Sequence, residues 1–395
     1  MRVTHVITRL IVGGAQENTV GTVLGLRERA DVHVELISGP TTGREGSLES
    51  AFAASPEVLA IAPALVRPVH PWKDALAYGQ LVRMLRARKP DIVHTHSGKA
   101  GVLGRLAARR AGVPVIIHHI HGPSFGPFQG PMANWIFTAA ERRASHVTTH
   151  FVCSANAMTR IYLERGIGRP DMYTRVFSGF RVEPYLGATN DLGLRSRLGL
   201  EHNAFVIGKV ARLAPLKGHE DLFAAFRDLL PQCSAARLLI IGDGPLRATL
   251  EAHVTEMGLK GKVVFTGLLP PGEVARYVGI MDCLAHLSMR EALSRALPQA
   301  LAAGKPVVAY DFDGADEICL EGKTGFLVRT GEVKTVSERL LQLAKDPALR
   351  ERFGNAGREF VRDQFPVERM VEQLYQLYLR LLRETARGIK GQGRD

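Results

Sequence analysis

The sequence predicts an α/β protein with two doubly wound parallel sheets, one in each half of the chain. Short apolar runs of strand length alternate with helical patterns from end to end, which is the signature of parallel sheets. A length of 395 residues is more than one such sheet ordinarily accommodates. Glycines and charged side chains follow several of the apolar runs, and open parallel sheets bind ligands beyond the carboxyl ends of their strands.

The two halves contain different numbers of predicted elements. In the first half we expect strands over residues 3–8, 32–37, 92–96, 115–120, 147–153 and 174–178, with helices over 17–29, 74–88, 101–111 and 133–144. In the second half we expect strands over 205–211, 237–241, 263–266, 282–287 and 306–309, with helices over 219–230, 246–257, 272–279 and 295–303.

The expected domain boundaries follow from this alternation. We assign an N-terminal domain to residues 1–186, a polar linker to 187–203 and a second domain to 204–365. Residues 366–385 are strongly helical and rich in Leu, Tyr, Arg and Glu. Residues 386–395 carry three glycines and little apolar content, so we expect a disordered tail there.

The composition favours a soluble, cytoplasmic protein. Hydrophobic residues make up 46% of the chain and charged residues 23%, which is ordinary for a globular protein. No window approaches 18 uncharged apolar residues, and the N-terminus lacks the long apolar core of a signal peptide. The spacing of the four cysteines fits neither a disulfide framework nor a metal site: Cys153, Cys233, Cys283 and Cys319.

The positive charge is concentrated in the first half. Residues 1–190 carry 22 Lys and Arg against 13 Asp and Glu, a net charge of +9, whereas residues 191–395 carry 29 against 26, or +3. A basic half favours an anionic partner such as a phosphate-bearing acceptor or an anionic bilayer. No nucleic-acid motif occurs, so nucleic acid is the least favoured partner. An ordinary basic surface remains equally consistent with the charge.

Glycine-rich turns in both halves could approach phosphates. Gly13 and Gly14 follow the first strand and open a helix, where backbone N–H groups favour negative charge, although a purely structural turn fits equally well. In the second half, Gly242 and Gly244 form a turn after one strand and Gly267 ends the next. Those glycines could admit a nucleotide base, and a simple turn is again an alternative.

Charged and amide side chains mark the second half more specifically. Arg212 and Lys217 follow a strand, and together they offer a planar fork and a point charge to a diphosphate. Glu291 lies in a loop before a predicted helix, and Gln299 lies about one turn into that helix. A carboxylate and an amide so placed can hold hydroxyl groups at two ends of one ligand.

Histidines crowd the first half. His94 and His96 share one strand face, and His118, His119 and His121 lie at the end of the next strand. A metal-dependent hydrolase built on these residues is one reading, but the additional ligands of a dinuclear site are missing, so we expect no metal. We expect His121 to be a polar contact in a ligand cleft.

These motifs together resemble the retaining family 4 GT-B glycosyltransferases, also called glycosyl transferases group 1, over residues 1–382. The resemblance implies two Rossmann-like domains facing across a cleft, with residues 366–385 as a C-terminal helix that crosses back to the first domain. It also implies catalytic roles for His121 and Glu291 at the donor sugar and for Arg212 and Lys217 at the diphosphate. The donor-binding residues that it implies are Gly13, Gly14, Gly242, Gly244, Gly267, Leu293, Ser294 and Gln299.

The chain departs from the family pattern in one segment. The family has a second glutamate at the position of Gln299, and flexible glycines where residues 292–294 are Ala, Leu and Ser. Gln299 can still donate and accept hydrogen bonds, so contact with ribose hydroxyls can persist without the charge.

The resemblance implies transfer of a sugar from a UDP-sugar or GDP-sugar to an acceptor hydroxyl with retention of configuration, without metal or other cofactor. The expected class is a hexosyltransferase of bacterial cell-surface polysaccharide or glycolipid assembly. The implied acceptor is a saccharide or lipid-linked saccharide, and the expected location is the cytoplasm, with peripheral contact to the anionic inner face of the plasma membrane. The alternatives are a non-catalytic sugar-nucleotide-binding protein, a nucleotide-sugar epimerase on the same fold and the metal-dependent hydrolase.

Overall fold

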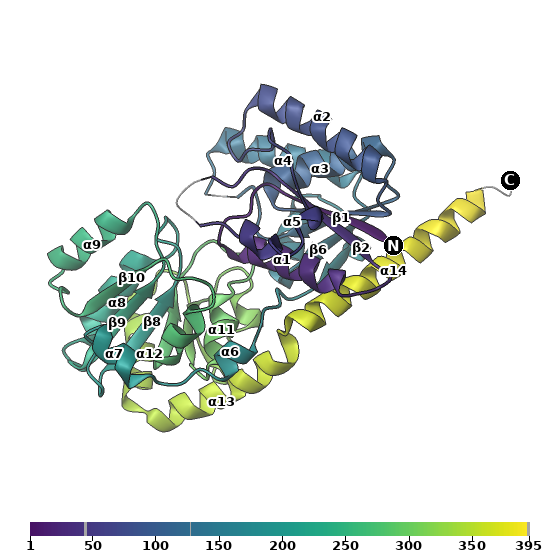
Figure 1. The fold of residues 1–395 in the computed structure, drawn as a ribbon. Helices are drawn as coiled ribbons and strands as arrows, with labels where there is room; N and C mark the ends of the chain where they lie inside the picture. The colour runs from purple at the N-terminus through teal and green to yellow at the C-terminus, as the bar shows by residue number, and fades with distance from the viewer. Residues whose placement is uncertain (43–45, 127, 393–395) are drawn as a thin grey trace. The chain divides into compact units, whose positions relative to one another are not determined.

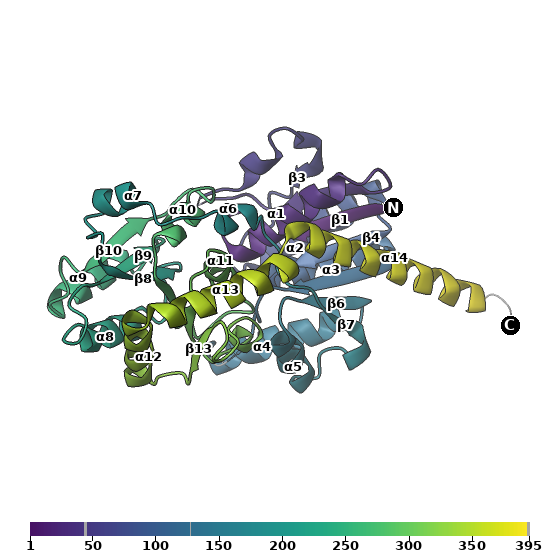
Figure 2. The ribbon, with the colours of Figure 1, turned by 90° about the horizontal axis from the view of Figure 1, so that it is seen from below.

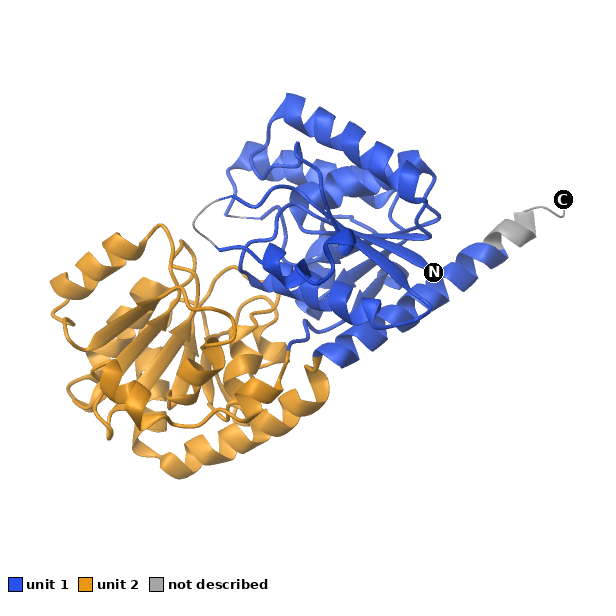
Figure 3. Cartoon of the chain, viewed as in Figure 1, with its two compact units in different colours: residues 1–180, 367–395 blue, residues 181–366 orange. Residues whose placement is uncertain are grey.

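The computed structural model describes residues 1–42, 46–126 and 128–392, and the chain divides into two compact units (Figure 3). Unit 1 comprises Met1–Phe180 and Val367–Asp395, and unit 2 comprises Arg181–Pro366. Each unit is built on its own parallel sheet, which confirms the predicted α/β class.

The sheet of unit 1 has the strand order β3-β2-β1-β4-β5-β6-β7 among the described residues, and its paired strands are all parallel. The central strands are almost entirely buried, as expected for a sheet covered on both faces. The strands are β1 (Arg2–Ile7), β2 (His33–Ser38), β3 (Leu59–Ile61), β4 (Ile92–His96), β5 (Val115–Ile120), β6 (His150–Cys153) and β7 (Tyr173–Arg175).

Helices cover both faces of this sheet (Figures 1 and 2). Helices α1 and α14 pack with β1, β2 and β4 in one apolar core, whereas α2 and α3 pack against the other face in a second core. The helices are α1 (Gly14–Arg27), α2 (Pro71–Arg88), α3 (Gly98–Ala111), α4 (Pro131–Ser145), α5 (Asn156–Glu164) and α14 (Val367–Gln392), with short 3₁₀ turns at Glu49–Phe52, Pro56–Val58 and Pro170–Met172.

Unit 2 repeats the design with the strand order β10-β9-β8-β11-β12-β13 among its described strands. Its strands are β8 (Phe205–Val210), β9 (Ala236–Ile241), β10 (Val263–Gly267), β11 (Cys283–His286), β12 (Val307–Tyr310) and β13 (Gly325–Val328). Its helices are α6 (Glu183–Leu186), α7 (Leu192–Arg197), α8 (His219–Leu229), α9 (Arg247–Glu256), α10 (Val274–Gly279), α11 (Ala296–Ala302), α12 (Val333–Lys345) and α13 (Pro347–Gln364), with a 3₁₀ turn at Ala315–Glu317.

The segment expected as a linker over 187–203 lies within unit 2 and is partly helical. Asp191 caps α7 by accepting a hydrogen bond from the Leu194 N–H. The guanidinium of Arg195 is buried and donates to the backbone oxygens of Ala204 and Ile280. These contacts tie the segment to the sheet of unit 2, so its polar composition reflects specific hydrogen bonds rather than a tether. The boundary between the units is instead at Arg181.

The C-terminal helix belongs to unit 1, as the resemblance implied. Helix α14 places Met370, Leu374 and Tyr378 in the core that α1 and β1 share. It crosses α1 so closely that a Cβ atom at Gly25 would lie 2.6 Å from Val371 Cγ2. The helix continues to Gln392, so the expected tail is helical over 386–392, and residues 393–395 lie outside the described residues. None of the described helices combines the length and apolar composition needed to cross a bilayer.

Candidate active site

The loop after β8 brings Arg212 and Lys217 to the carboxyl end of the unit 2 sheet. Backbone hydrogen bonds fasten this loop to the turn after β9, with the Leu213 N–H donating to the Asp243 oxygen at 3.0 Å. Gly218 begins α8 with a left-handed φ of 63°. A Cβ atom there would lie 2.0 Å from the Leu287 oxygen, so glycine is required for the loop to approach the end of β11.

Lys217 and Glu291 form an ion pair at this edge of the sheet. Lys217 Nζ lies 2.5 Å from Glu291 Oε1, and the same oxygen accepts a hydrogen bond from Ser288 Oγ at 3.2 Å. The Glu291 N–H donates to Asp313 Oδ2 at 2.8 Å. Two predicted catalytic residues that are 74 positions apart in sequence are therefore in direct contact.

Glu291 is held as a carboxylate. Burial alone would raise its pKa. The positive charge of Lys217 lowers it, as do the nearby His286 and hydrogen bonds from Lys217 and Ser288, and together these effects outweigh burial, so that the pKa of Glu291 is lowered. Burial, together with the negative charge of Glu291, raises the pKa of Asp313 to about 6. An ionised Glu291 only accepts hydrogen bonds, which suits it to bind hydroxyl groups.

The structure adds two residues that the sequence interpretation did not select. Asp313 accepts a hydrogen bond from the backbone N–H of Glu291. Lys209 lies within β8 with 1% of its surface exposed, and its Nζ has no hydrogen-bond partner among the described residues. Burial, followed by repulsion from Lys217, lowers the pKa of Lys209 to about 7. A lysine inside an otherwise apolar strand was the signal that could have identified it.

The predicted donor-binding glycines of unit 2 have structural roles of their own. Gly242 has a φ of 134°, and a Cβ atom there would lie 2.1 Å from the Ala211 oxygen. Gly244 approaches the Leu213 oxygen in the same way. The Gly242 N–H donates to the Gly267 oxygen at 3.1 Å, which joins the ends of β9 and β10. Close backbone packing accounts for Gly242 and Gly244, and a φ of 76° favours glycine at position 267. Contact of these glycines with a nucleotide stays a prediction.

The remaining predicted residues of unit 2 lie at the start of α11. Leu293 and Ser294 are half-buried in the loop that follows Glu291. Gln299 lies in the first turn of α11, where its N–H donates to the Arg295 oxygen at 3.1 Å. Their placement agrees with the sequence prediction that Glu291 precedes the helix and Gln299 lies about one turn into it.

Gly13 and Gly14 open α1 in unit 1, as predicted. Gly13 is the N-cap with an extended φ of 173°, which any residue can adopt. A Cβ atom there would meet only the far end of the flexible Gln16 side chain, at 3.0 Å. Neither the backbone conformation nor rigid neighbours therefore require glycine at position 13.

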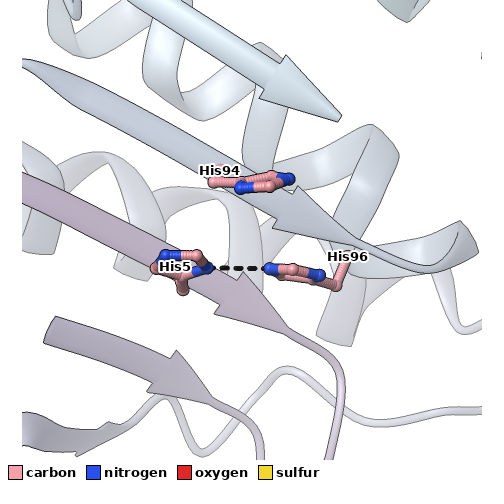
Figure 4. A group of neighbouring side chains, drawn as sticks. All are labelled: His5, His94 and His96. Carbon is pink, nitrogen blue, oxygen red and sulfur yellow. Dashed lines mark hydrogen bonds between the residues drawn. The ribbon is translucent and has the colours of Figure 1, made fainter. Parts of the chain in front are cut away.

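Five histidines stack on one face of the unit 1 sheet. The parallel register pairs His5 with His94 and His96 with His119, and His121 follows the end of β5. The ring centroids of His119 and His121 are 4.0 Å apart, and those of His94 and His96 are 4.6 Å apart. Figure 4 shows the side chains of His5, His94 and His96 gathered where they project from the neighbouring strands β1 and β4.

His118 does not join this cluster. Its Nδ1 lies 3.0 Å from Thr95 Oγ1 on the opposite face of the sheet, because neighbouring residues of a strand point to opposite faces. The hydrolase set of His94, His96, His118 and His121 is therefore not assembled. Two other groups of histidines each have ring nitrogens within 4.8 Å of one another, which is close enough to hold one metal ion. The groups are His5, His94 and His96, and His96, His119 and His121.

Hydrogen bonds link three of these histidines into a chain that ends at His121. His5 Nδ1 lies 2.8 Å from His96 Nε2 (Figure 4), and His96 Nδ1 lies 2.9 Å from His121 Nε2. Burial lowers the pKa of His5 and of His121 to about 3. Burial also lowers the pKa of His96, with further lowering by the neighbouring imidazoles. All three rings are therefore neutral near pH 7.

Neutrality allows two tautomer orders along this chain. In one, His5 donates to His96 and His96 donates to His121, so His121 keeps its proton on Nδ1. In the other, His5 carries its proton on Nε2, which has no partner among the described residues. A buried N–H donor without a partner is rarer in proteins than an acceptor without one, so we assign the first order. His121 is only half-buried, and it then offers an Nδ1–H to a ligand.

The two units differ in charge. Unit 1 carries 27 Lys and Arg against 16 Asp and Glu, a net charge of +11, whereas unit 2 carries 24 against 23, or +1. The structural division therefore separates the charge more sharply than the halves of the sequence did.

The known proteins and families that this chain matches are glycosyltransferases. The profile of the family "Glycosyl transferases group 1" matches residues 193–360, and that of the "Glycosyl transferase 4-like domain" matches residues 13–176. The chain is 30% identical over 307 residues to 2-deoxystreptamine glucosyltransferase of Streptomyces kanamyceticus, covering 74% of this chain and 78% of that protein. It is 28% identical over 324 residues to the UDP-Gal:alpha-D-GlcNAc-diphosphoundecaprenol alpha-1,3-galactosyltransferase of Escherichia coli, covering 80% and 82%. Its fold is similar to that of Anabaena Alr3699/HepE in complex with UDP-glucose, with a TM-score of 0.79, 21% identity and coverage of 95% and 99%.

Proposed function

Since this chain belongs to the group 1 glycosyltransferases of GT-B fold and uses nucleotide sugars in polysaccharide or glycolipid biosynthesis, we propose that it transfers a hexose with retention of anomeric configuration. The observation that carries this proposal is the Lys217–Glu291 pair at the carboxyl end of the unit 2 sheet. One side chain suits a phosphate and the other suits sugar hydroxyls, and the two lie in contact.

Positive charge supports departure of the nucleoside diphosphate. Arg212 and Lys217 follow β8 at the carboxyl end of the sheet. Fixed cations stabilise the negative charge that develops on the leaving phosphate, which is the role a divalent metal ion plays in other transferases. We therefore propose that the reaction needs no metal and no further cofactor.

The proposed chemistry is attack from the face that the leaving group occupies. A bond forms between the acceptor oxygen and the anomeric carbon while the bond from that carbon to the phosphate oxygen breaks. The acceptor's proton passes to the departing diphosphate, so no carboxylate nucleophile is needed. Glu291 accepts hydrogen bonds from hydroxyls of the donor sugar, and Gln299 replaces a carboxylate with an amide at the ribose.

Unit 1 supplies further groups in this proposal. His121 donates its Nδ1–H to a hydroxyl of the donor sugar. The backbone at Gly13 approaches a phosphate, which would explain a glycine that neither its φ nor its described neighbours require. The acceptor is a saccharide or a lipid-linked saccharide. We also propose that unit 1 contacts an anionic membrane peripherally, at the cytoplasmic face of the plasma membrane, and its net charge of +11 supports this proposal.

Thermal unfolding with UDP, GDP and their sugar conjugates tests the donor site. A ligand at about 100 times its dissociation constant stabilises a protein by roughly 2.7 kcal/mol, which gives a readable shift in Tm. We expect a shift with one nucleotide that is lost in Arg212→Ala and retained in the control Arg227→Ala, an exposed arginine on α8. No shift with any nucleotide at millimolar concentration would overturn the donor site.

Product analysis tests the chemistry separately. We expect NMR of the product to show the anomeric configuration of the donor, and we expect the rate to be unchanged by a chelator. Inversion would refute the proposed face of attack, and loss of activity with chelator that zinc restores would favour a metal site among the histidines. Nucleotide binding without turnover on any acceptor would support the non-catalytic alternative, and interconversion of donor sugars would support the epimerase.

A further inference from the structure

The exposed large apolar side chains of the described residues are concentrated on unit 1. Seven of nine belong to it, and six of these fall in two short segments, 69–76 and 132–136. Trp72 is 79% exposed and Trp135 is 71% exposed. The chain contains only two tryptophans, so both of them lie on the surface. The six side chains are Val69, Trp72, Leu76, Met132, Trp135 and Ile136.

On α2, the apolar residues and two arginines share one solvent-facing stripe. Trp72, Leu76, Gly79, Arg83 and Arg86 are spaced by four, three, four and three residues, which keeps them on one face of a helix. All five are exposed. A Cβ atom at Gly79 would meet nothing within 4 Å, so no part of the described chain covers the middle of this stripe.

Helix α4 has the same arrangement. Met132, Ile136 and Arg143 lie on one solvent-facing stripe, and Trp135 and Arg142 flank it. The apolar residues occupy the first half of each helix and the arginines the second half. Leu76 precedes Arg83 by seven residues, as Ile136 precedes Arg143, which is about 10 Å along each helix axis.

The apolar ends of both helices lie at the same edge of the sheet. Helix α3 packs against both α2 and α4 on one face of the sheet (Figures 1 and 2). Helices α3 and α4 follow strands that run parallel to one another, so they begin at the carboxyl edge of the sheet. Lys99, at the start of α3, pairs with Asp74 of α2 at 2.5 Å and donates to the Pro68 oxygen. These contacts hold the start of α2 and the loop before it against the start of α3.

We infer that the exposed stripes of α2 and α4 dock unit 1 on an anionic lipid bilayer, with the tryptophans and their apolar neighbours inserted and the arginines at the lipid phosphates. This inference rests on the proposed function in one respect, since it gives the membrane contact proposed there a specific surface. Tryptophan is the side chain most suited to the boundary between acyl chains and headgroups, and arginine binds phosphate with a planar fork.

Charge favours the bilayer over a second copy of this chain. Unit 1 has a net charge of +11, and self-association through these stripes would bring arginine-rich surfaces of two copies together. An anionic bilayer complements both the apolar residues and the arginines of the stripes, because it has an apolar layer beneath a layer of phosphates.

Tryptophan fluorescence of the intact chain tests the inference directly, because both tryptophans lie on the proposed surface. We expect phosphatidylglycerol-containing vesicles to shift the emission to the blue at low salt, and vesicles of phosphatidylcholine alone to give a much weaker response. Brominated acyl chains should quench the emission of the bound protein. An emission spectrum that phosphatidylglycerol vesicles leave unchanged would overturn the inference.

Variants assign the binding to particular residues. In vesicle sedimentation, Leu76→Ser combined with Ile136→Ser should weaken binding at least tenfold, and Arg83→Gln or Arg143→Gln should weaken it about fivefold each and reduce its salt dependence. The matched control is Leu268→Ser, an exposed leucine of unit 2 that should change nothing. Equal losses in the control and the stripe variants would refute the assignment.

Two further measurements distinguish this inference from self-association of the chain and from the proposed donor site. The first is the oligomeric state. The inference fails if the protein does not bind anionic vesicles and is a dimer that becomes a monomer when Leu76→Ser is combined with Ile136→Ser, because the surface then joins two copies of the chain. The stripe variants should retain the Tm shift with nucleotide. Vesicle binding without any nucleotide-induced shift would overturn the donor site and leave the docking surface standing.

Discussion

Replacing Lys209 by methionine should make the protein more stable, although it removes a residue close to the predicted diphosphate site. Lys209 is 1% exposed, and its Nζ has no hydrogen-bond partner among the described residues. Methionine has nearly the same length and needs no partner. The folded state should therefore lose the free-energy cost of a buried ammonium group.

The magnitude follows from the pKa. Burial lowers the pKa of Lys209 from 10.5 to about 7, and each pKa unit corresponds to about 1.36 kcal/mol, so burying the charge costs about 5 kcal/mol at low pH. Between pH 7 and pH 10.5 the unfolded state binds the proton that the folded state has released, so the stability of the wild type rises with pH in that window. The rise between pH 7 and 9.5 should be roughly 3 kcal/mol.

Urea denaturation of the wild type and Lys209→Met at several pH values measures this effect. The difference in unfolding free energy should favour the variant at pH 7 and shrink by roughly 3 kcal/mol by pH 9.5, because all other titrations are common to both proteins. Lys209→Met should also bind UDP or GDP more weakly. A free-energy difference that does not change with pH, or a variant less stable at every pH, would refute the reasoning.

Two further predictions concern unit 1. Arg105 and Glu141 form a fully buried ion pair at 2.5 Å, so Arg105→Met should lower the unfolding free energy by about 3–5 kcal/mol by leaving the carboxylate buried without its partner. Adding Glu141→Leu should recover most of that loss in urea denaturation, and failure to recover would contradict the explanation. The tautomer assigned to His121 predicts that His121→Asn, whose amide nitrogen replaces Nδ1, keeps about three- to tenfold more transferase activity than His121→Gln, whose amide nitrogen replaces Nε2. Equal kcat/KM values for the two variants would contradict the assigned tautomer.

Local patterns were sufficient to predict the class of fold and several placements. The period of two in a strand places His94 and His96 on one face, and the structure confirms this. His5 joins them only because β1 pairs with β4, and the sequence does not reveal which strands are neighbours. The same period places His118 on the opposite face, away from the hydrolase set suggested by sequence proximity alone.

Contacts between distant loops were harder to predict. The sequence selected Lys217 and Glu291 separately, but their contact depends on β8 and β11 being neighbours in the sheet. Asp313 lies in a run of acidic residues with no motif of its own, and only the folded loop shows that it accepts a hydrogen bond from the Glu291 N–H. The short edge strands β3 and β13 were missed, because three or four residues carry too little pattern to distinguish a strand from a loop.

Helix α14 completes unit 1 but lies at the end of the sequence, and this affects how the protein folds during its synthesis. Unit 2 is one continuous stretch of chain and can complete its core as soon as residue 366 has left the ribosome. Unit 1 begins earlier but must wait for Met370, Leu374 and Tyr378, which are made about 200 residues after β7. At typical bacterial elongation rates this is a delay of roughly 10–40 s. During that interval the face of the sheet that carries His94 is covered by α1 but still lacks α14, so we expect the nascent first domain to bind chaperones that shield apolar surface.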